Sequence, residues 1–147
     1  MRTRRVSPFL LSLVLSLALL GRAQAAPTEI KGAAILDHPC GKVAVKNMDL
    51  VHAGKVAEAN KLTTKKTQDQ WKAMPVKDRK MMAGMAKELS VSGAQFSDEI
   101  KAGGLLVLDG TAGTLTVKRE HKDANGSVSD TFTQKYVFDG GVCLITH

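Results

Sequence analysis

The sequence predicts an α+β domain, with helices in the N-terminal part of the chain packed on an antiparallel sheet formed by the C-terminal part. Two observations support this fold class. Apolar residues recur with the period of an α-helix as far as about residue 100, and from Leu105 onward they follow the two-residue period of a strand. A run of helices followed by a run of strands is typical of α+β proteins, in which the helices cover one face of the sheet.

The first 25 residues have the pattern of a secretory signal peptide. Three arginines among the first five residues precede an apolar run over residues 9–20, and residues 23–25, Ala-Gln-Ala, form a small-x-small cleavage site. The apolar run is shorter than the roughly 20 residues that span a bilayer. We therefore expect cleavage after residue 25 or 26, a single domain over residues 26–147, and a periplasmic or secreted protein.

Several helical segments are expected between the signal and the strands. Pro39 suits the first turn of a helix, and Gly54 ends it. Thr67–Gln70 has capping-box spacing and opens a helix that Pro75 interrupts. In order, the helices are expected at residues 40–53, 56–62, from 67 to 75, from 78 to 89, and around Phe96 and Ile100. Whether residues 30–36 form a strand is left open.

A methionine stripe marks the helix expected after Pro75. Met81, Met82, Met85 and Leu89 recur along one helical face. Such a stripe can line a soft binding groove or bind copper(I). We expect ordinary packing in the core instead, because copper sites combine Met with His or Cys at close spacing and this helix has neither.

The C-terminal part is expected to form an antiparallel meander, with a strand at residues 105–108 and a hairpin over residues 114–138. Asn125-Gly126 suits a type I′ turn, and Asp139-Gly140-Gly141 returns the chain as a last strand over residues 142–147. A turn centred on Asn125-Gly126 pairs His121 with Asp130, Arg119 with Phe132, Val117 with Gln134 and Leu115 with Tyr136.

The two cysteines, Cys40 and Cys143, lie near opposite ends of the exported chain. An even number of cysteines in an oxidising compartment predicts a disulfide, and the last strand should present Cys143 toward the helix that carries Cys40. The alternative is a zinc set formed by His38, Cys40, Cys143 and His147. We expect the disulfide, because free thiols rarely persist after export.

Charge and motifs narrow the possible partners. Four of the 21 Lys and Arg residues fall in the signal, which leaves a net charge of +3 on residues 26–147, with both signs interspersed. No basic stripe interleaved with aromatics is present, so we expect no nucleic-acid partner. No second apolar stretch is long enough to span a membrane.

Three segments resemble a known superfamily. They are VKNMDLVHAGKVAEA at residues 45–59, AGTLTV at 112–117 and YVFDGG at 136–141. In this pattern the chain is similar to small secreted members of the nuclear-transport-factor-two-like superfamily, close to its lumazine-binding-like domains of unknown function. The resemblance implies a cone in which helices pack on a strongly curved sheet with a pocket on its concave face. The Met-rich middle section and the six aromatic residues depart from the family pattern.

The predicted strand register places a polar patch on the apolar face of the sheet. Its members lie toward one end of the strands, where they either pair at the rim or line the mouth of a cavity for a small polar or anionic ligand. We take them as the candidate ligand-binding residues: Arg119, His121, Asp130, Gln134, Tyr136 and His147.

The sequence carries no recognisable catalytic motif, so we assign no catalytic residue, metal or cofactor. The function expected is an exported, non-catalytic binding or interaction domain. One alternative is a small pocket enzyme of the ketosteroid-isomerase-like type, with His121 as a base oriented by Asp130. Another is a secreted inhibitor or immunity protein that blocks its target with the hairpin 114–138.

Overall fold

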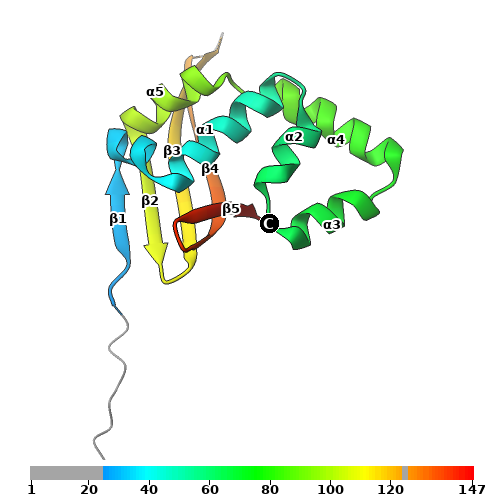
Figure 1. Ribbon diagram of the computed structural model, residues 1–147. Coiled ribbons are helices and arrows are strands. Elements are labelled where there is room, and N and C mark those ends of the chain that lie inside the picture. The colour runs from blue at the N-terminus through cyan, green and yellow to red at the C-terminus, as the bar shows by residue number, and fades with distance from the viewer. Residues whose placement is uncertain (1–24, 124–125) are drawn as a thin grey trace, which may run out of the picture.

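The computed structural model describes residues 25–123 and 126–147, and the side chains of residues 121–123 lie outside this description. The predicted signal peptide lies outside the described residues except for Ala25, and so does the expected turn residue Asn125. The described chain has the predicted α+β architecture, with helices packed against a five-stranded antiparallel sheet (Figure 1). Within it, no helix is long and apolar enough to cross a membrane.

The sheet has the strand order β1-β2-β3-β4-β5, and each pair of neighbours is antiparallel. Only part of the segment 30–36 is extended, because a 3-10 helix, η1, begins at Gly32. The strands are β1 (Thr28–Lys31), β2 (Gly104–Asp109), β3 (Ala112–Asp123), β4 (Gly126–Asp139) and β5 (Val142–Thr146).

The helices form two groups. In Figure 1, α1 and α5 lie across one face of the sheet, whereas α2, α3 and α4 extend to the side beyond β5. We call residues 55–89 the arm and the remaining described residues the body. The helical elements are η1 (Gly32–Asp37), α1 (Pro39–His52), α2 (Val56–Ala59), η2 (Asn60–Leu62), α3 (Lys65–Ala73), α4 (Val76–Leu89) and α5 (Gly93–Gly103).

The pairing of β3 with β4 differs from the predicted register by two residues. Asp123 lies opposite Gly126, so Arg119 faces Asp130 and His121 faces Val128. The predicted His121–Asp130 pair is therefore wrong. Side chains alternate between the two faces of a sheet, so a shift of two residues leaves every side chain on its predicted face. The hydrophobic pattern fixed the faces correctly but was unable to distinguish these two registers.

A single hydrophobic core lies between the sheet and the two helices that cover it. Its twelve residues all belong to the body. They come from η1, α1, α5 and strands β2 to β5: Ile35, Cys40, Ala44, Met48, Phe96, Ile100, Leu106, Leu115, Val117, Tyr136, Cys143 and Ile145.

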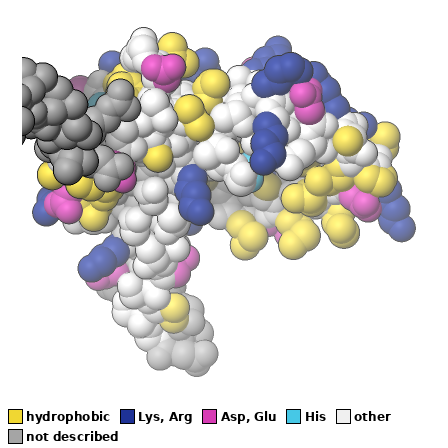
Figure 2. All heavy atoms as spheres, turned by 90° about the horizontal axis from the view of Figure 1, so that it is seen from below, with side chains coloured by type: hydrophobic (Ala, Val, Ile, Leu, Met, Phe, Trp, Pro, Cys, Tyr) yellow, Lys and Arg dark blue, Asp and Glu magenta, His cyan; other side chains and the backbone are white. Residues whose placement is uncertain are grey.

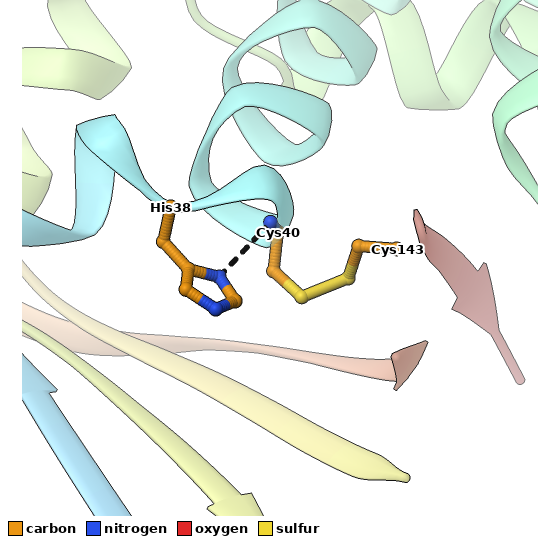
Figure 3. The surroundings of a disulfide bond; sticks show 3 residues. All are labelled: His38, Cys40 and Cys143. Carbon is orange, nitrogen blue, oxygen red and sulfur yellow. Dashed lines mark hydrogen bonds between the residues drawn. A yellow bond between two sulfur atoms is a disulfide. The ribbon is translucent and has the colours of Figure 1, made fainter. Parts of the chain in front are cut away.

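The predicted disulfide crosses this core. Cys40 in the first turn of α1 is bonded to Cys143 of β5, 103 residues away in the sequence (Figure 3). His38 caps α1, because its Nδ1 accepts a hydrogen bond from the amide of Cys40 at 3.2 Å. Since both sulfur atoms belong to the disulfide, the alternative zinc set is not formed.

The two longer helices of the arm begin earlier than the sequence predicts, whereas α2 begins at Val56 as expected. Thr64, three residues before the expected start, caps α3 by accepting a hydrogen bond from the amide of Thr67. The next helix, α4, begins directly after Pro75 at Val76. At the base of the arm, Thr63 forms a parallel bridge with Ile145, and the Thr64 amide donates to the Ile145 carbonyl at 2.8 Å.

The methionine stripe of α4 is exposed, so the prediction that it packs in the core is wrong. Every side chain of α4 is at least partly exposed, and its partly buried side chains are Asp78, Arg79, Ala83 and Ala86. The large apolar side chains of α4 are between 46% and 75% exposed. Periodicity reveals that a helix has an apolar face, but it does not show that this face meets the core.

Candidate functional site

A groove of about 370 Å³ lies where the arm joins the body. It is bounded by α1, α2, α3, α4, Gln134 of β4 and the C-terminal end of β5, and we call it the arm groove. Among the described residues that line it, none is Lys, Arg, Asp or Glu. The lining is Asn47, Val51, Val56, Ala59, Asn60, Thr63, Thr67, Gln70, Trp71, Met74, Met82, Ala86, Gln134, Ile145 and His147.

The apolar wall of the groove is built by the two longer helices of the arm. Trp71 and Met74 come from the last turn of α3 and its C-cap, and Met82 and Ala86 come from α4. Pro75 ends α3 and allows α4 to start at once, which brings the two helices together at an angle (Figure 1). Trp71 is the only tryptophan of the protein, so its fluorescence reports directly on this wall.

The polar side of the groove is held in place by short-range hydrogen bonds. The Thr63 hydroxyl donates to the Asn60 carbonyl at 2.7 Å, and the Gln68 side-chain amide donates to the Thr63 carbonyl at 2.9 Å. Thr67 is buried, and its hydroxyl lies 3.0 Å from that of Thr64. The groove therefore combines fixed hydrogen-bonding groups with apolar groups.

The six predicted ligand-binding residues do not form one site. Gln134 and His147 both line the arm groove. Asp130 lies exposed on the far part of β4, and the side chain of His121 lies outside the described residues. Arg119 and Tyr136 are buried in the body and belong to its interior.

Arg119 links α5 to the sheet. Its Nε lies 3.0 Å from Oε2 of Glu99, and both side chains are largely buried, with exposures of 9% and 16%. The N–H bond is not directed at that oxygen, so the contact is an ion pair without hydrogen-bond geometry. The guanidinium carbon also lies 5.5 Å from the centre of the Phe96 ring and 4.9 Å from that of Phe132. Arg119 is therefore engaged in the fold rather than presented to a ligand.

Tyr136 is part of the core beside the disulfide. Tyr136 lies opposite Gly113 in the sheet. A Cβ built on Gly113 would lie 3.4 Å from the Tyr136 Cβ and 4.0 Å from the Cys40 sulfur, so the tyrosine and the disulfide are neighbours around this glycine. Burial raises the pKa of the Tyr136 hydroxyl well above its usual value of 10.0. A neutral, enclosed phenol of this kind does not exchange protons with a ligand near neutral pH.

A second hollow, of about 450 Å³, lies between α1 and α5, and Lys42, Lys46 and Asp49 line it. These three side chains are exposed to solvent. The Asp49 carboxylate already accepts a hydrogen bond from the Gly93 amide at 3.1 Å. Although it is the larger of the two, this hollow is a solvated cleft between helices, and the arm groove is the better candidate binding site.

Sequence reasoning missed the arm groove because it placed the methionine stripe in the core. Trp71 and Met74 were visible as apolar residues beside Pro75, but nothing in their spacing shows that a hollow lies between them and the sheet. Among the described residues, no group of His, Cys, Asp or Glu is arranged to hold a metal ion.

Comparison with known proteins adds no assignment: no family model, curated protein or solved structure matches the chain. The resemblance to the nuclear-transport-factor-two-like superfamily therefore stays a prediction.

Proposed function

We propose that the protein is an exported, non-catalytic binding domain that takes an apolar ligand with neutral polar groups in the arm groove. The observation that carries this proposal is the composition of the lining, which combines Trp71, methionines and aliphatic side chains with amides, hydroxyls and the His147 ring. Such a site gains affinity from burying apolar surface, and its few polar groups orient the ligand.

This ligand differs from the polar or anionic ligand expected from the sequence. The cation of that expected site, Arg119, is engaged by Glu99 and two aromatic rings. The enzyme alternative also loses its main support, since His121 faces Val128 rather than Asp130 across the hairpin.

Export is supported by two features of the chain. The first 25 residues have the signal pattern described above, and the Cys40–Cys143 disulfide suits an oxidising compartment. The intact mass of the protein isolated from its native cells tests this part of the proposal. We expect the mass of a chain that begins at Ala26 or Pro27, and a mass that includes residues 1–25 would contradict it.

Binding in the groove is tested by titration with N-phenyl-1-naphthylamine, a neutral apolar dye. Bound dye accepts excitation energy from Trp71, so tryptophan emission falls as dye emission rises. Met82→Gln should weaken dye binding about fivefold, because it replaces an apolar wall group with a polar one.

Met81→Gln is the matched control for this titration. Met81 is the neighbouring residue on the same helix and is more exposed than Met82, but it does not line the groove. We expect unchanged dye affinity for this variant. Equal affinity in the wild type and the Met82→Gln variant would refute binding in the groove.

A further inference from the structure

The free flank of α4 is the largest group of exposed apolar side chains on one element of the described structure. Met81, Met82, Met85 and Leu89 are 59%, 46%, 55% and 75% exposed. Their positions i, i+1, i+4 and i+8 place them on one side of the helix, which we call the methionine flank. Exposed apolar side chains grouped on one side of a helix are typical of surfaces that bind a protein or a membrane.

The fold does not require this flank to be apolar. The partly buried side chains of α4 are Asp78, Arg79, Ala83 and Ala86, and the His52 ring lies 3.2 Å from the carbonyl of Ser90 just after the helix. Of the methionine flank, only Met82 borders the arm groove. The side chains of Met81, Met85 and Leu89 are 55% to 75% exposed, so they gain the free energy of burial only when something outside the chain covers them.

The charge of the arm differs in sign from the charge of the body. Residues 55–89 hold nine Lys and Arg residues and four Asp and Glu residues, a net charge of +5. Residues 26–54 and 90–147 hold eight and ten, a net charge of −2. Figure 2 shows hydrophobic side chains gathered at the α3 and α4 end of the molecule, with Lys and Arg side chains near them.

The basic residues of α4 are spread along the helix rather than arranged as a specific pocket. Lys77, Lys80 and Lys87 are exposed, and Lys77 lies one turn before Met81. A diffuse positive charge beside flexible apolar side chains matches a surface that is anionic and fluid rather than one of fixed shape. Anionic phospholipid headgroups over acyl chains have this chemistry.

We propose that α4 lies in the interface of an anionic phospholipid bilayer, with its methionine flank inserted among the upper acyl chains and the lysines of the arm among the headgroups. The inference does not rest on a ligand in the arm groove. The groove nevertheless opens beside the membrane contact, because Met82 belongs both to its wall and to the flank. A protein bound in this way would present the groove to the lipid.

The test measures binding of the full exported chain to phosphatidylglycerol-containing vesicles and to pure phosphatidylcholine vesicles by co-sedimentation. We expect binding to the anionic vesicles that weakens as salt is raised, and much weaker binding to the neutral ones. Met85→Gln/Leu89→Gln should lower the partition into anionic vesicles about tenfold, because two large apolar groups no longer enter the bilayer. Neither residue lines the groove, so dye binding should stay at the wild-type level.

The matched control is Val137→Gln/Val142→Gln, which changes two valines that are 40% and 59% exposed on the sheet. We expect wild-type binding to vesicles for this control. Three results would overturn the proposal: equal partition of the wild type and the methionine-flank variant, equal binding to neutral and anionic vesicles, or a dimer in solution that the flank variant dissociates. The last result would show instead that the flank joins two copies of the chain.

Discussion

The body and the arm use helices in opposite ways. In the body, α1 and α5 supply five of the twelve core residues and are fixed to the sheet by a disulfide and a buried ion pair. In the arm, α4 is as long as α1 and contributes no buried residue. The buried core and its cross-links are therefore concentrated in the body, and the large apolar side chains of α4 are left on the surface.

The largest effect should come from removing the disulfide of the body. The Cys40→Ser/Cys143→Ser variant should lose about 4 kcal/mol of unfolding free energy, because the bond closes a loop of about 100 residues in the unfolded chain. Urea denaturation, with the slope fitted separately for each protein because the unfolded variant is less compact, measures this difference. A loss below about 1 kcal/mol would show that the rest of the core sets the stability of the body.

The buried ion pair of the body should have the next largest effect. Arg119→Ala should lower the unfolding free energy by about 3 kcal/mol, because Glu99 is left largely buried without its cation. The double variant Arg119→Met/Glu99→Met should recover most of that loss, since it removes both charges and keeps apolar volume. If the two variants are equally unstable, packing of Arg119 against Phe96 and Phe132 matters more than its charge.

One substitution made in both regions should give effects of opposite sign. Gly41 in α1 packs against the Ile35 carbonyl so closely that an added Cβ would collide with it, and Gly41→Ala should cost about 2 kcal/mol. Gly84 in α4 has open space around it, and Gly84→Ala should raise stability by about 0.5 to 1 kcal/mol through helix propensity. Thermal unfolding of the two variants makes the comparison. Equal effects would mean that α1 and α4 are packed equally tightly.

The smallest predicted effect concerns pH. Burial lowers the pKa of His38 from its usual 6.5, and the neutral ring is the form that caps α1. The stability from this neutral ring is complete above pH 6.5 and is lost as pH falls toward the lower folded pKa, because the unfolded chain binds the proton first. His38→Asn keeps a cap that does not titrate, so its stability should fall less between neutral and mildly acidic pH.

Urea titrations of the wild type and the His38→Asn variant at several pH values measure this difference. The two proteins differ only at residue 38, so the comparison isolates the contribution of His38. Parallel pH profiles for the two proteins would show that His38 titrates equally in the folded and unfolded chains.

Much of the body was predictable from sequence because its signals are local. Alternation along residues 114–122 and 127–138 assigned each side chain to a face, and the inward position of Cys143 predicted its bond to Cys40. The register was not predictable to the residue, since pairing Arg119 with Asp130 or with Phe132 buries the same face. Only the turn residues could distinguish the two registers, and the Asn125-Gly126 pair favoured the register that the structure does not have.

The arm was less predictable because its structure depends on where helices meet, not on their period. The stripe from Met81 to Leu89 has the pattern of a core helix, yet its large apolar side chains are 46% to 75% exposed. Gln134 and His147 were selected for a polar site at the sheet and lie instead in a groove completed by Trp71. No local signal in the sequence brings residues of α3 and β4 to the same hollow.

The joint between arm and sheet also affects how the domain behaves at high concentration. An open strand edge is a template for adding strands from other molecules, which leads to fibres. On β5 the Ile145 carbonyl is already bonded to the Thr64 amide of the same chain. At the opposite edge, β1 has only four residues and carries the Glu29–Lys31 ion pair at 3.2 Å. Short, charged or covered edges resist such growth, so the sheet limits edge-to-edge aggregation on both sides.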